Sequence, residues 1–565
     1  MATAPASPTF TVSQRLLRGY GPLAVFAVLL LLMSLLVPSK SPTKVNAAGA
    51  GSDTGGDVGI VGGQAGDAGA PGSAAGAAGG TAGAAGGAAG ASKPGAAAAA
   101  AAAKTPCTDR KDQVQGDPYS PPCIAFSGNN GGVTAKGVTP TEIHVAYRSL
   151  NEKGFQQTLA ALAGASLQDG PDDINRTVQA LGEYFNRHFQ FYGRKVVFDI
   201  YNGQGSSTTE LLGGGQDKAE ADADTVKAHG DFADMSAVSE PYADALAKRG
   251  IVGFGDPYLS QSWHVQHAPY IWSLASDGTF VAKMAAEYAG KRLCNKPAKW
   301  AGDDGNGKSM ATKPRNIATF APENSWYQES VQVAIQVAKK YGCQAGPNVE
   351  YQLDLGTMSN QAQNLIPKMK AQGVTTILCG CDPIMPVFLT GEMNREHYYP
   401  EFIVVGTALT DTDIVGQLWN QNEAVHAFGV SSLQAPVPPT QTIAYEAYKT
   451  VRQDEPAFTV DLIYYQMEMM AIGIQMAGPN LTPATFQQGM YAYPPKLGPA
   501  GFWEFGGQPA NIHNWTAPHD VREVYWDSTK PSAYNNKAGT FVETFPGVRW
   551  KEGQIPPGDP PIPVR

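Results

Sequence analysis

The sequence predicts an α/β protein in which two doubly wound parallel-sheet units follow one another along the chain. Three observations lead to this class. From Val133 onward, short β-branched runs alternate with segments of helical period. The spacing of these runs fits right-handed helical crossovers, which cover a parallel sheet on both faces. The alternation begins again after a helix near 280–288, so each unit has its own sheet.

The elements of the first unit come in regular order. EIHVAYRSL at 142–150 and KVVFDIY at 195–201 are predicted strands. One apolar helical face lies between them, marked by Ile174, Val178, Leu181 and Phe185. A polar-faced helix then ends at Gly230, and DMSAV, SEPYADALAKRG and IVGFGD continue as strand, helix and strand.

The second unit repeats this order. NIATFAP at 316–322 is a predicted strand, and the helix after it carries Val331 and Ile335 on one face. The strands VEYQLDL, TTILC, FIVVG and HAFGVS follow, with a further helix before TTILC. Past Ser431, apolar residues recur at helical spacing: Leu462, Tyr465, Met469, Ile472 and Met476. The methionines among them are predicted to pack in a core rather than to hold a ligand.

An export segment precedes the two units. Arg15 and Arg18 stand before the uncharged apolar stretch Gly21–Val37, which is typical of a signal peptide or a signal anchor. The stretch is at the short edge of what crosses a bilayer, so cleavage and membrane retention both stay open. The basic residues before it predict an extracytoplasmic location for the rest, facing outside. Residues 1–46 are assigned to this segment, and the Ala/Gly-rich residues 47–104 are expected to be a disordered tether.

Six cysteines fit an oxidising compartment. Cys107 and Cys123 enclose a short loop in the Cys/Pro-rich lead-in 105–132, and they are candidates for a local disulfide. Cys294 and Cys343 each follow a helix-like run and could join neighbouring helix ends.

The pair Cys379 and Cys381, in TTILCGCDPIMP, is harder to interpret. Residues two apart in a strand have Cα atoms near the ~7 Å upper limit for a disulfide, so a bond would require Gly380 to bend. We expect two free, half-buried thiols first, a strained disulfide second and a metal site last.

Charge and motifs exclude several functions. Lys and Arg total 41 against 50 Asp and Glu, and no basic stripe is present, so nucleic acid is not an expected partner. The sequence lacks G-x-S-x-G, H-E-x-x-H and a Gly-Lys phosphate loop, so we expect no enzyme and no cofactor. His264 and His267 have no ligand at fixed spacing, and the loop 303–308 lacks the Glu of a calcium loop, so no metal is expected.

Several phrases carry a family resemblance: KVVFDIYNGQGS, IVGFGDPYLSQSW, PENSWYQES and PEFIVVG in this order. The chain from Gly137 to Gly547 thereby resembles the type I periplasmic binding proteins, and within them the leucine/branched-chain amino-acid receptor family of ABC transporters. The resemblance implies two lobes joined by three crossing segments. It places the first lobe at 133–274 with a return at 436–525, and the second at 275–435 with part of the C-terminal segment. Residues 526–565 form a C-terminal segment with a Pro-rich tail.

The resemblance also implies that a ligand binds between the lobes, at the carboxyl ends of the strands. Ser239 begins a helix, where a hydroxyl and free N–H groups could hold a carboxylate, although it could equally be a plain N-cap. Asp256 could take an ammonium, and Trp326 stands where the family has an aromatic clamp. The full set of expected ligand-binding residues is Tyr147, Arg148, Ser239, Asp256, Tyr258, Trp326, Asp382 and Thr407.

One departure from the family pattern concerns the ligand. Amino-acid receptors of this family have a Gly-, Ser- and Thr-rich loop where this chain has Val238-Ser239-Glu240-Pro241. Glu240 adds a negative charge and Pro241 removes one N–H, and both changes disfavour an α-carboxylate there.

Two functional hypotheses follow. In the first, the protein captures a small polar molecule, such as an amino acid or a related acid or amide, and delivers it to an ABC-type permease. In the second, a membrane-tethered sensor or interaction protein of the same fold reports closure to a partner protein. An uncleaved Gly21–Val37 segment would favour the second hypothesis.

Overall fold

The computed structural model describes residues 107, 110–150, 169–255, 258–344, 346–506 and 515–564. The predicted export segment and the Ala/Gly-rich tether lie outside these residues, so both stay predictions. Among the described helices, none combines the length and the apolar character that crossing a membrane requires.

The first sheet is parallel throughout and has the strand order β2-β1-β3-β4-β5. Its strands are β1 (Glu142–Ser149), β2 (Lys195–Asn202), β3 (Ala233–Ala237), β4 (Val252–Gly255) and β5 (Ile271–Trp272). This 2-1-3-4-5 order is one of the doubly wound orders, in which the connecting helices pass over both faces. The parallel sheet predicted for the first unit is confirmed.

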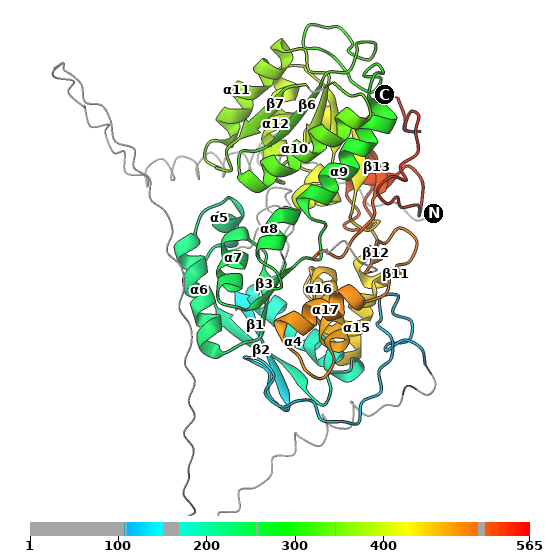
Figure 1. Ribbon diagram of the computed structural model, residues 1–565. Helices are drawn as coiled ribbons and strands as arrows, with labels where there is room; N and C mark the ends of the chain where they lie inside the picture. Colours follow the sequence, from blue (N-terminus) through cyan, green and yellow to red (C-terminus); the bar gives the residue numbers. More distant parts are fainter. Residues whose placement is uncertain are drawn as a thin grey trace, which may run out of the picture. The chain divides into compact units, whose positions relative to one another are not determined.

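Helices cover both faces of this sheet, and together they form the first lobe (Figure 1). The helices are α4 (Pro171–His188), α5 (Ser207–Leu211), α6 (Gln216–His229), α7 (Glu240–Lys248), α8 (Gln261–Gln266), α15 (Ile443–Val451), α16 (Val460–Ala477) and α17 (Pro483–Ala492). Ile143 and Val145 belong to the core with α4 and α16, whereas Ala146 belongs to the core with α6 and α7. Alternate residues of one strand therefore serve two helix layers.

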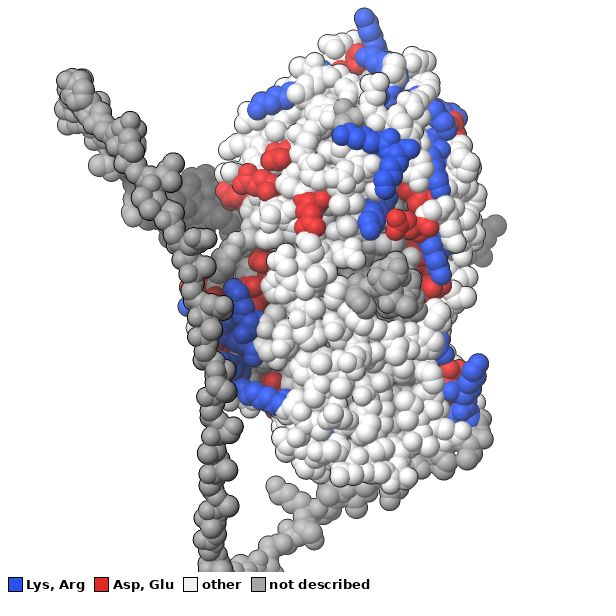
Figure 2. All heavy atoms as spheres, in the orientation of Figure 1, with Lys and Arg blue, Asp and Glu red and all other residues white. Residues whose placement is uncertain are grey.

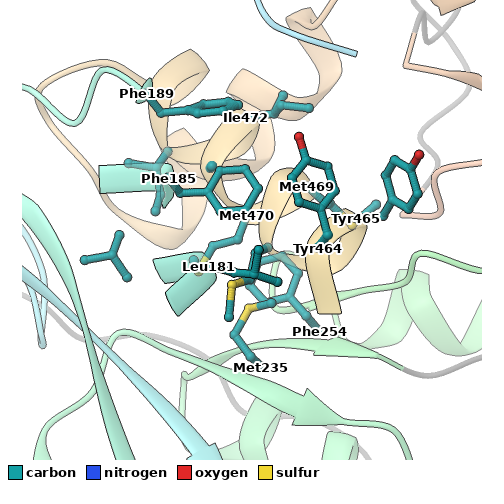
Figure 3. Close-up of a cluster of buried hydrophobic side chains, with 14 of the residues drawn as sticks. Leu181, Phe185, Phe189, Met235, Phe254, Tyr464, Tyr465, Met469, Met470 and Ile472 are labelled. Carbon is teal, nitrogen blue, oxygen red and sulfur yellow. The ribbon is translucent and has the colours of Figure 1, made fainter. Parts of the chain in front are cut away.

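The core between α4 and α16 is rich in methionine and aromatic side chains. Figure 3 shows Met469 and Met470 of α16 lying among Leu181 and Phe185 of α4, with Met235 and Phe254 contributed by β3 and β4. The packing role predicted for the methionines is confirmed for Met469, which is 1% exposed.

The second sheet has the order β14-β13-β10-β9-β8-β6-β7. Its strands are β6 (Ile317–Pro322), β7 (Asn348–Tyr351), β8 (Thr376–Cys379), β9 (Glu401–Val404), β10 (Ala427–Ser431), β13 (Arg522–Pro531) and β14 (Ala538–Glu543). The pairs among β6 to β10 are parallel, as predicted. β13 and β14 add an antiparallel edge that the sequence analysis did not foresee, because the aromatic, Gly- and Pro-rich C-terminal segment has no clear strand pattern.

Helices also cover both faces of the second sheet and complete the second lobe. They are α9 (Gly278–Tyr288), α10 (Ser325–Lys340), α11 (Met358–Ala371), α12 (Met385–Arg395), α13 (Asp413–Gly416) and α14 (Gln421–Ala424). Ile377 and Phe402 pack in the core with α11 and α12, whereas Leu378 and Ile403 pack in the core with α9. On the face shown in Figure 2, basic and acidic side chains of this lobe are interspersed, so this face presents no field of one sign.

The chain passes between the two lobes three times: from β5 to α9, from β10 to α15, and from the short hairpin β11 (Lys496–Leu497) and β12 (Glu504–Phe505) to β13. The first and third passages lie side by side, since the Ser273 N–H donates to the Trp515 carbonyl at 2.8 Å and the Ala517 N–H donates to the Ser273 carbonyl at 3.0 Å. The three-segment hinge is confirmed. The residue boundaries of the lobes stay predictions, and β13 begins at Arg522, inside the range 436–525 expected to return to the first lobe.

All six cysteines are paired. Cys107–Cys123 and Cys294–Cys343 form the two predicted disulfides, with Cα atoms 5.6 and 5.3 Å apart. The expectation of free thiols at Cys379 and Cys381 is wrong, because these residues form a disulfide with Cα atoms 5.1 Å apart. β8 ends at Cys379, so the chain bends at Gly380 and brings the two Cα atoms closer than they would be in a strand.

Candidate functional site

A cavity of about 500 Å³ lies between the two lobes. It is lined where parallel strands of both sheets end: Tyr147 of β1 and Gly255 of β4 contribute from the first lobe, and Asp382 and Ser432, after β8 and β10, from the second. Open α/β sheets bind ligands at this edge, and 300–1,000 Å³ is the usual size of a small-molecule site. The cavity is therefore the candidate site.

Most of the cavity wall is apolar. The α16 residues Leu462, Ile463 and Met467 form one side, and Leu409 with Val415 lies on the second lobe. Ala408 and Leu409 adopt left-handed φ angles of 50° and 66°, which non-glycine residues rarely do. Such strain persists where the surrounding structure enforces it, often at binding sites.

Arg148 lines the cavity, but its charge is already paired. Its Nη1 and Nη2 donate to the two Glu210 carboxylate oxygens at 2.9 and 2.8 Å, and Nη1 lies 3.3 Å from Asp222 Oδ2. Burial alone would lower the pKa of Arg148, but the bond to Glu210 raises it overall. Ser239 Oγ also donates to Glu210, at 2.5 Å, so this hydroxyl is committed as well. A carboxylate ligand would have to displace Glu210 to reach Arg148.

Asp382 also lines the cavity and is also satisfied from within the second lobe. Its Oδ2 accepts from the Tyr351 hydroxyl at 2.5 Å, and its Oδ1 accepts from the Ile384 and Met385 N–H groups at 2.8 and 3.2 Å. Burial raises the pKa of Asp382, although these donors oppose the rise. Its carboxylate thus holds the loop after β8.

Two tyrosines of the predicted set are at the cavity. Tyr147 lines it at the end of β1, and burial raises the pKa of its hydroxyl. Tyr258 stacks on Tyr327 of the second lobe, with ring centroids 5.9 Å apart and planes 9° from parallel. The Tyr258 hydroxyl accepts from the Glu240 N–H at 2.9 Å. This stack is a direct aromatic contact between the lobes.

Three other predicted residues do not line the cavity that the described residues enclose. Ser239 turns to Glu210, and Trp326 packs against the core of α6 and α7. Successive helical residues point about 100° apart, so the aromatic side chain at the cavity is Tyr327, the next residue of α10. Thr407 is buried outside the cavity lining, whereas Ala408 and Leu409, which follow it after the turn at Gly406, line the cavity. Asp256 lies outside the described residues.

The second lobe supplies polar groups that the sequence analysis missed: Asp411, Gln434 and Arg522. Among the described residues, the Asp411 carboxylate oxygens, Gln434 Oε1 and Arg522 Nη1 are buried without a hydrogen-bond partner. Arg522 Nε donates to the Leu433 carbonyl at 3.1 Å, while Nη1 stays 3.9 Å from Glu543 Oε1. Buried polar groups of this kind are costly unless something pairs with them.

Burial changes the pKa values of both charged residues. It lowers the pKa of Arg522 to about 10, with a contribution from the nearby Arg549 charge. It raises the pKa of Asp411, although the Arg522 and Arg549 charges oppose the rise, as does the nearby Ser431 hydroxyl, which lacks the geometry of a full hydrogen bond. In each case the charged form has lost hydration that a bound ligand of opposite charge could replace.

The sequence could have indicated Asp411 as a cavity residue, but not Arg522. Asp411 follows β9 by seven residues, so the rule that pointed to Thr407 also covers it. Arg522 opens an antiparallel strand in a segment without a strand pattern, and the sequence offers no signal for it.

No protein-family model matches the sequence, and no curated protein matches it. Solved structures similar to the chain include a fatty acid ABC transporter substrate-binding protein from Thermomonospora curvata, with 12% identity and a TM-score of 0.49 over 76% of this chain and 99% of that one. A solute-binding protein from R. palustris in complex with 4-hydroxybenzoate has 11% identity and a TM-score of 0.48, over 73% and 98% of the two chains. A branched-chain amino acid transporter substrate-binding protein from Streptococcus pneumoniae in complex with isoleucine has 11% identity and a TM-score of 0.45, over 71% and 100%.

These structures are ABC transporter substrate-binding proteins, the class that the sequence resembles. All three TM-scores lie below 0.5, so the fold is assigned from the chain's own sheets and crossings. Two doubly wound α/β lobes, three crossing segments and a cavity at the carboxyl ends of both sheets make up a two-lobed, type I periplasmic-binding-protein fold.

Proposed function

We propose that the protein is an extracytoplasmic solute receptor that holds a small molecule between its lobes and performs no covalent chemistry on it. The observation that carries this proposal is the cavity of about 500 Å³ at the carboxyl ends of the strands of both sheets. Closure of the two lobes about the hinge would enclose the ligand, as hinge motions do in two-lobed binding proteins.

The cavity favours a ligand with an apolar body and one charged end. Ile463, Met467 and Leu409 typify the lining, which suits a hydrocarbon or aromatic group better than a wholly polar molecule. Arg522 Nη1 would hold a carboxylate, and Asp411 would hold an ammonium beside it. A hydrophobic amino acid or a related acid meets both requirements. The expectation of a small polar ligand is thereby narrowed to an amphipathic one.

The hydrogen bonds of the first-lobe loop Val238–Pro241 support the proposal that the ligand carboxylate binds to the second lobe. In Val238–Pro241 the Ser239 hydroxyl is bound to Glu210, and the Glu240 N–H is bound to Tyr258. Neither group is therefore available to a ligand without rearrangement. On this proposal Tyr147, Tyr258 and Asp382 shape the cavity, and Arg148 positions the first-lobe wall.

Calorimetric titration of the purified full-length protein with three matched probes tests the ligand class. L-Phenylalanine carries both charges, 3-phenylpropionate only the carboxylate, and 2-phenylethylamine only the ammonium. We expect affinity to fall in that order, and each bound probe should raise the melting temperature. A wider panel would contain branched-chain amino acids, benzoates and short fatty acids. If no member of either set binds, the receptor proposal fails.

We further propose that an ABC-type permease receives the ligand. Cells with and without the gene would be compared for uptake of a labelled probe that the purified protein binds. Loss of uptake in the deletion strain would support delivery. Unchanged uptake, with binding intact, would favour the membrane-tethered sensor instead.

A further inference from the structure

A second cluster of polar side chains lies in the first lobe, away from the cavity. His144 of β1, Asp199 of β2 and Asp231, just before β3, bring one ligand atom each to within 4.8 Å of one another. His144 and Asp231 stand where β1 and β3 begin, whereas the cavity is at the ends of these strands. His264 lies on α8 and His267 directly follows it, and neither belongs to this cluster.

Of the three side chains, Asp231 has the charge that is most costly to bury when no cation is bound. Its side chain is 0% exposed, and neither carboxylate oxygen has a hydrogen-bond partner among the described residues. Burial and the neighbouring Asp199 carboxylate raise the pKa of Asp231 to about 8. Two carboxylates this close, one of them buried, require a shared proton or a bound cation.

His144 is oriented as a metal ligand usually is. Its Nδ1 lies 2.8 Å from Asp199 Oδ2, and its Nε2 lies 3.4 Å from Glu142 Oε2. With Nδ1 on a metal, the Nε2 N–H would donate to Glu142. This carboxylate–histidine–metal arrangement fixes the ring and strengthens the ligand. The His144 and Asp199 side chains are 32% and 35% exposed, so an ion could reach them from solvent.

We propose that His144, Asp199 and Asp231 form a zinc site in which Glu142 orients His144. One imidazole nitrogen with two carboxylate oxygens suits Zn²⁺, whereas Ca²⁺ and Mg²⁺ prefer oxygen ligands alone. Ligand atoms around tetrahedral zinc lie about 3.3 Å apart, so small side-chain rotations would complete the geometry. His229 Nδ1, 3.8 Å from Asp231 Oδ2, or a water would take the fourth position.

The ion would link β1, β2 and the start of β3. It would lie away from the strand ends that line the cavity. Because it binds only the folded chain, Zn²⁺ would raise the stability of the protein. It would leave the affinity for the cavity ligand unchanged. The proposal of a zinc site and the proposal of a receptor function can therefore be refuted independently.

The test is calorimetric titration of the full-length protein with ZnCl₂ after removal of bound metal with a chelator and removal of the chelator. We expect one Zn²⁺ per chain and a rise in melting temperature. Asp231→Asn should weaken binding more than about 100-fold, and Glu142→Gln about 10- to 100-fold, as expected for an outer-shell partner. Asp217→Asn is the matched control, because this exposed carboxylate lies outside the cluster and should change nothing.

Asp231→Asn removes a buried charge without changing the side-chain shape, so the variant should fold, and circular dichroism would confirm this. If it did not fold, Asp199→Asn, at a partly exposed position, would replace it. Absence of zinc binding by the wild type would overturn the proposal. So would equal binding by the cluster variants, or binding of Ca²⁺ in preference to Zn²⁺.

Discussion

The cavity walls hold Arg148 of the first lobe and Arg522 and Asp411 of the second in opposite ways. On the first lobe, Glu210 binds both terminal nitrogens of Arg148 and Asp222 approaches Nη1, so the charge is neutralised inside the lobe although Nε has no partner among the described residues. On the second lobe, Arg522 and Asp411 line the same cavity but keep buried polar atoms without hydrogen-bond partners among the described residues. Arg522 and Asp411 therefore have charged groups left to offer a ligand. On the first wall, Asp461 Oδ1 of α16 is also buried without a partner among the described residues.

This difference separates residues that stabilise the fold from residues that we expect to bind the ligand. A buried ion pair holds its own loops in place, and breaking it leaves an isolated charge at a high cost. A buried group without a partner costs free energy in the empty protein and regains it when a ligand pairs with it. We therefore expect substitution of Arg148 to change stability, and substitution of Asp411 or Arg522 to change affinity.

The largest expected effect is on the first wall. Arg148→Met would leave Glu210 and Asp222 buried without their cation, and it should lower the free energy of unfolding by about 3–5 kcal/mol. Urea denaturation measures this change. Arg452→Met, which breaks the exposed pair with Asp454, is the control and should change little. Equal effects of the two substitutions would contradict the structural role of Arg148.

On the second wall, Asp411→Asn should weaken binding of L-phenylalanine about 10- to 100-fold, which corresponds to a lost charged hydrogen bond of about 1.5–3 kcal/mol. It should not lower the stability of the empty protein, because it removes a buried charge. Asp413→Asn, two residues along and also at the cavity, is the matched comparison. The Asp413 carboxylate accepts from Ser532, Thr540 and the Phe541 N–H, so this change should destabilise the fold. Calorimetry and thermal unfolding of both variants separate the two outcomes.

The pH dependence of stability sharpens the same comparison. Burial raises the pKa of Asp411 above 3.8, so as pH rises from about 4 the unfolded chain releases this proton before the folded chain does. The stability of the wild type should therefore fall relative to Asp411→Asn across that window, and the two should agree below it. Unfolding free energies of both proteins from pH 3 to 8 measure the difference. A difference that is independent of pH would show that Asp411 has an ordinary pKa.

The smallest expected effect is at the contact between the walls. Tyr327→Leu removes the stack on Tyr258, and an aromatic pair contributes about 0.5–1.5 kcal/mol beyond its buried area. Ligand affinity should therefore fall roughly 2- to 10-fold if the stack forms as the lobes close. Tyr327→Phe keeps the ring and should bind as the wild type does. Equal loss in both variants would assign the effect to the hydroxyl instead.

Local pattern predicted much of the fold. The runs at 142–150 and 195–201 became β1 and β2, and the helix stop at Gly230, whose φ is 91°, is where α6 ends. These features depend on neighbouring residues, which a sequence displays directly. β13 and β14 were missed because antiparallel pairing at the edge of the second sheet depends on the distant β10.

The site was predicted less completely, because partners and side-chain directions are not local. Arg148, Tyr147, Tyr258 and Asp382 line the cavity, as the rule for strand ends suggests. The neutralisation of Arg148 comes from Glu210, 62 residues away, and no local pattern reports it. Trp326 and Tyr327 are adjacent on α10, and only the phase of that helix decides which one faces the cavity.

A crystal structure of the protein with a bound carboxylate solute tests the central claim most directly. We predict that the ligand carboxylate lies within hydrogen-bond distance of Arg522 Nη1, with its apolar body along α16, and that Arg148 stays bound to Glu210. A ligand whose carboxylate has displaced Glu210 from Arg148, with Arg522 and Asp411 unchanged, would contradict the assignment of recognition to the second wall.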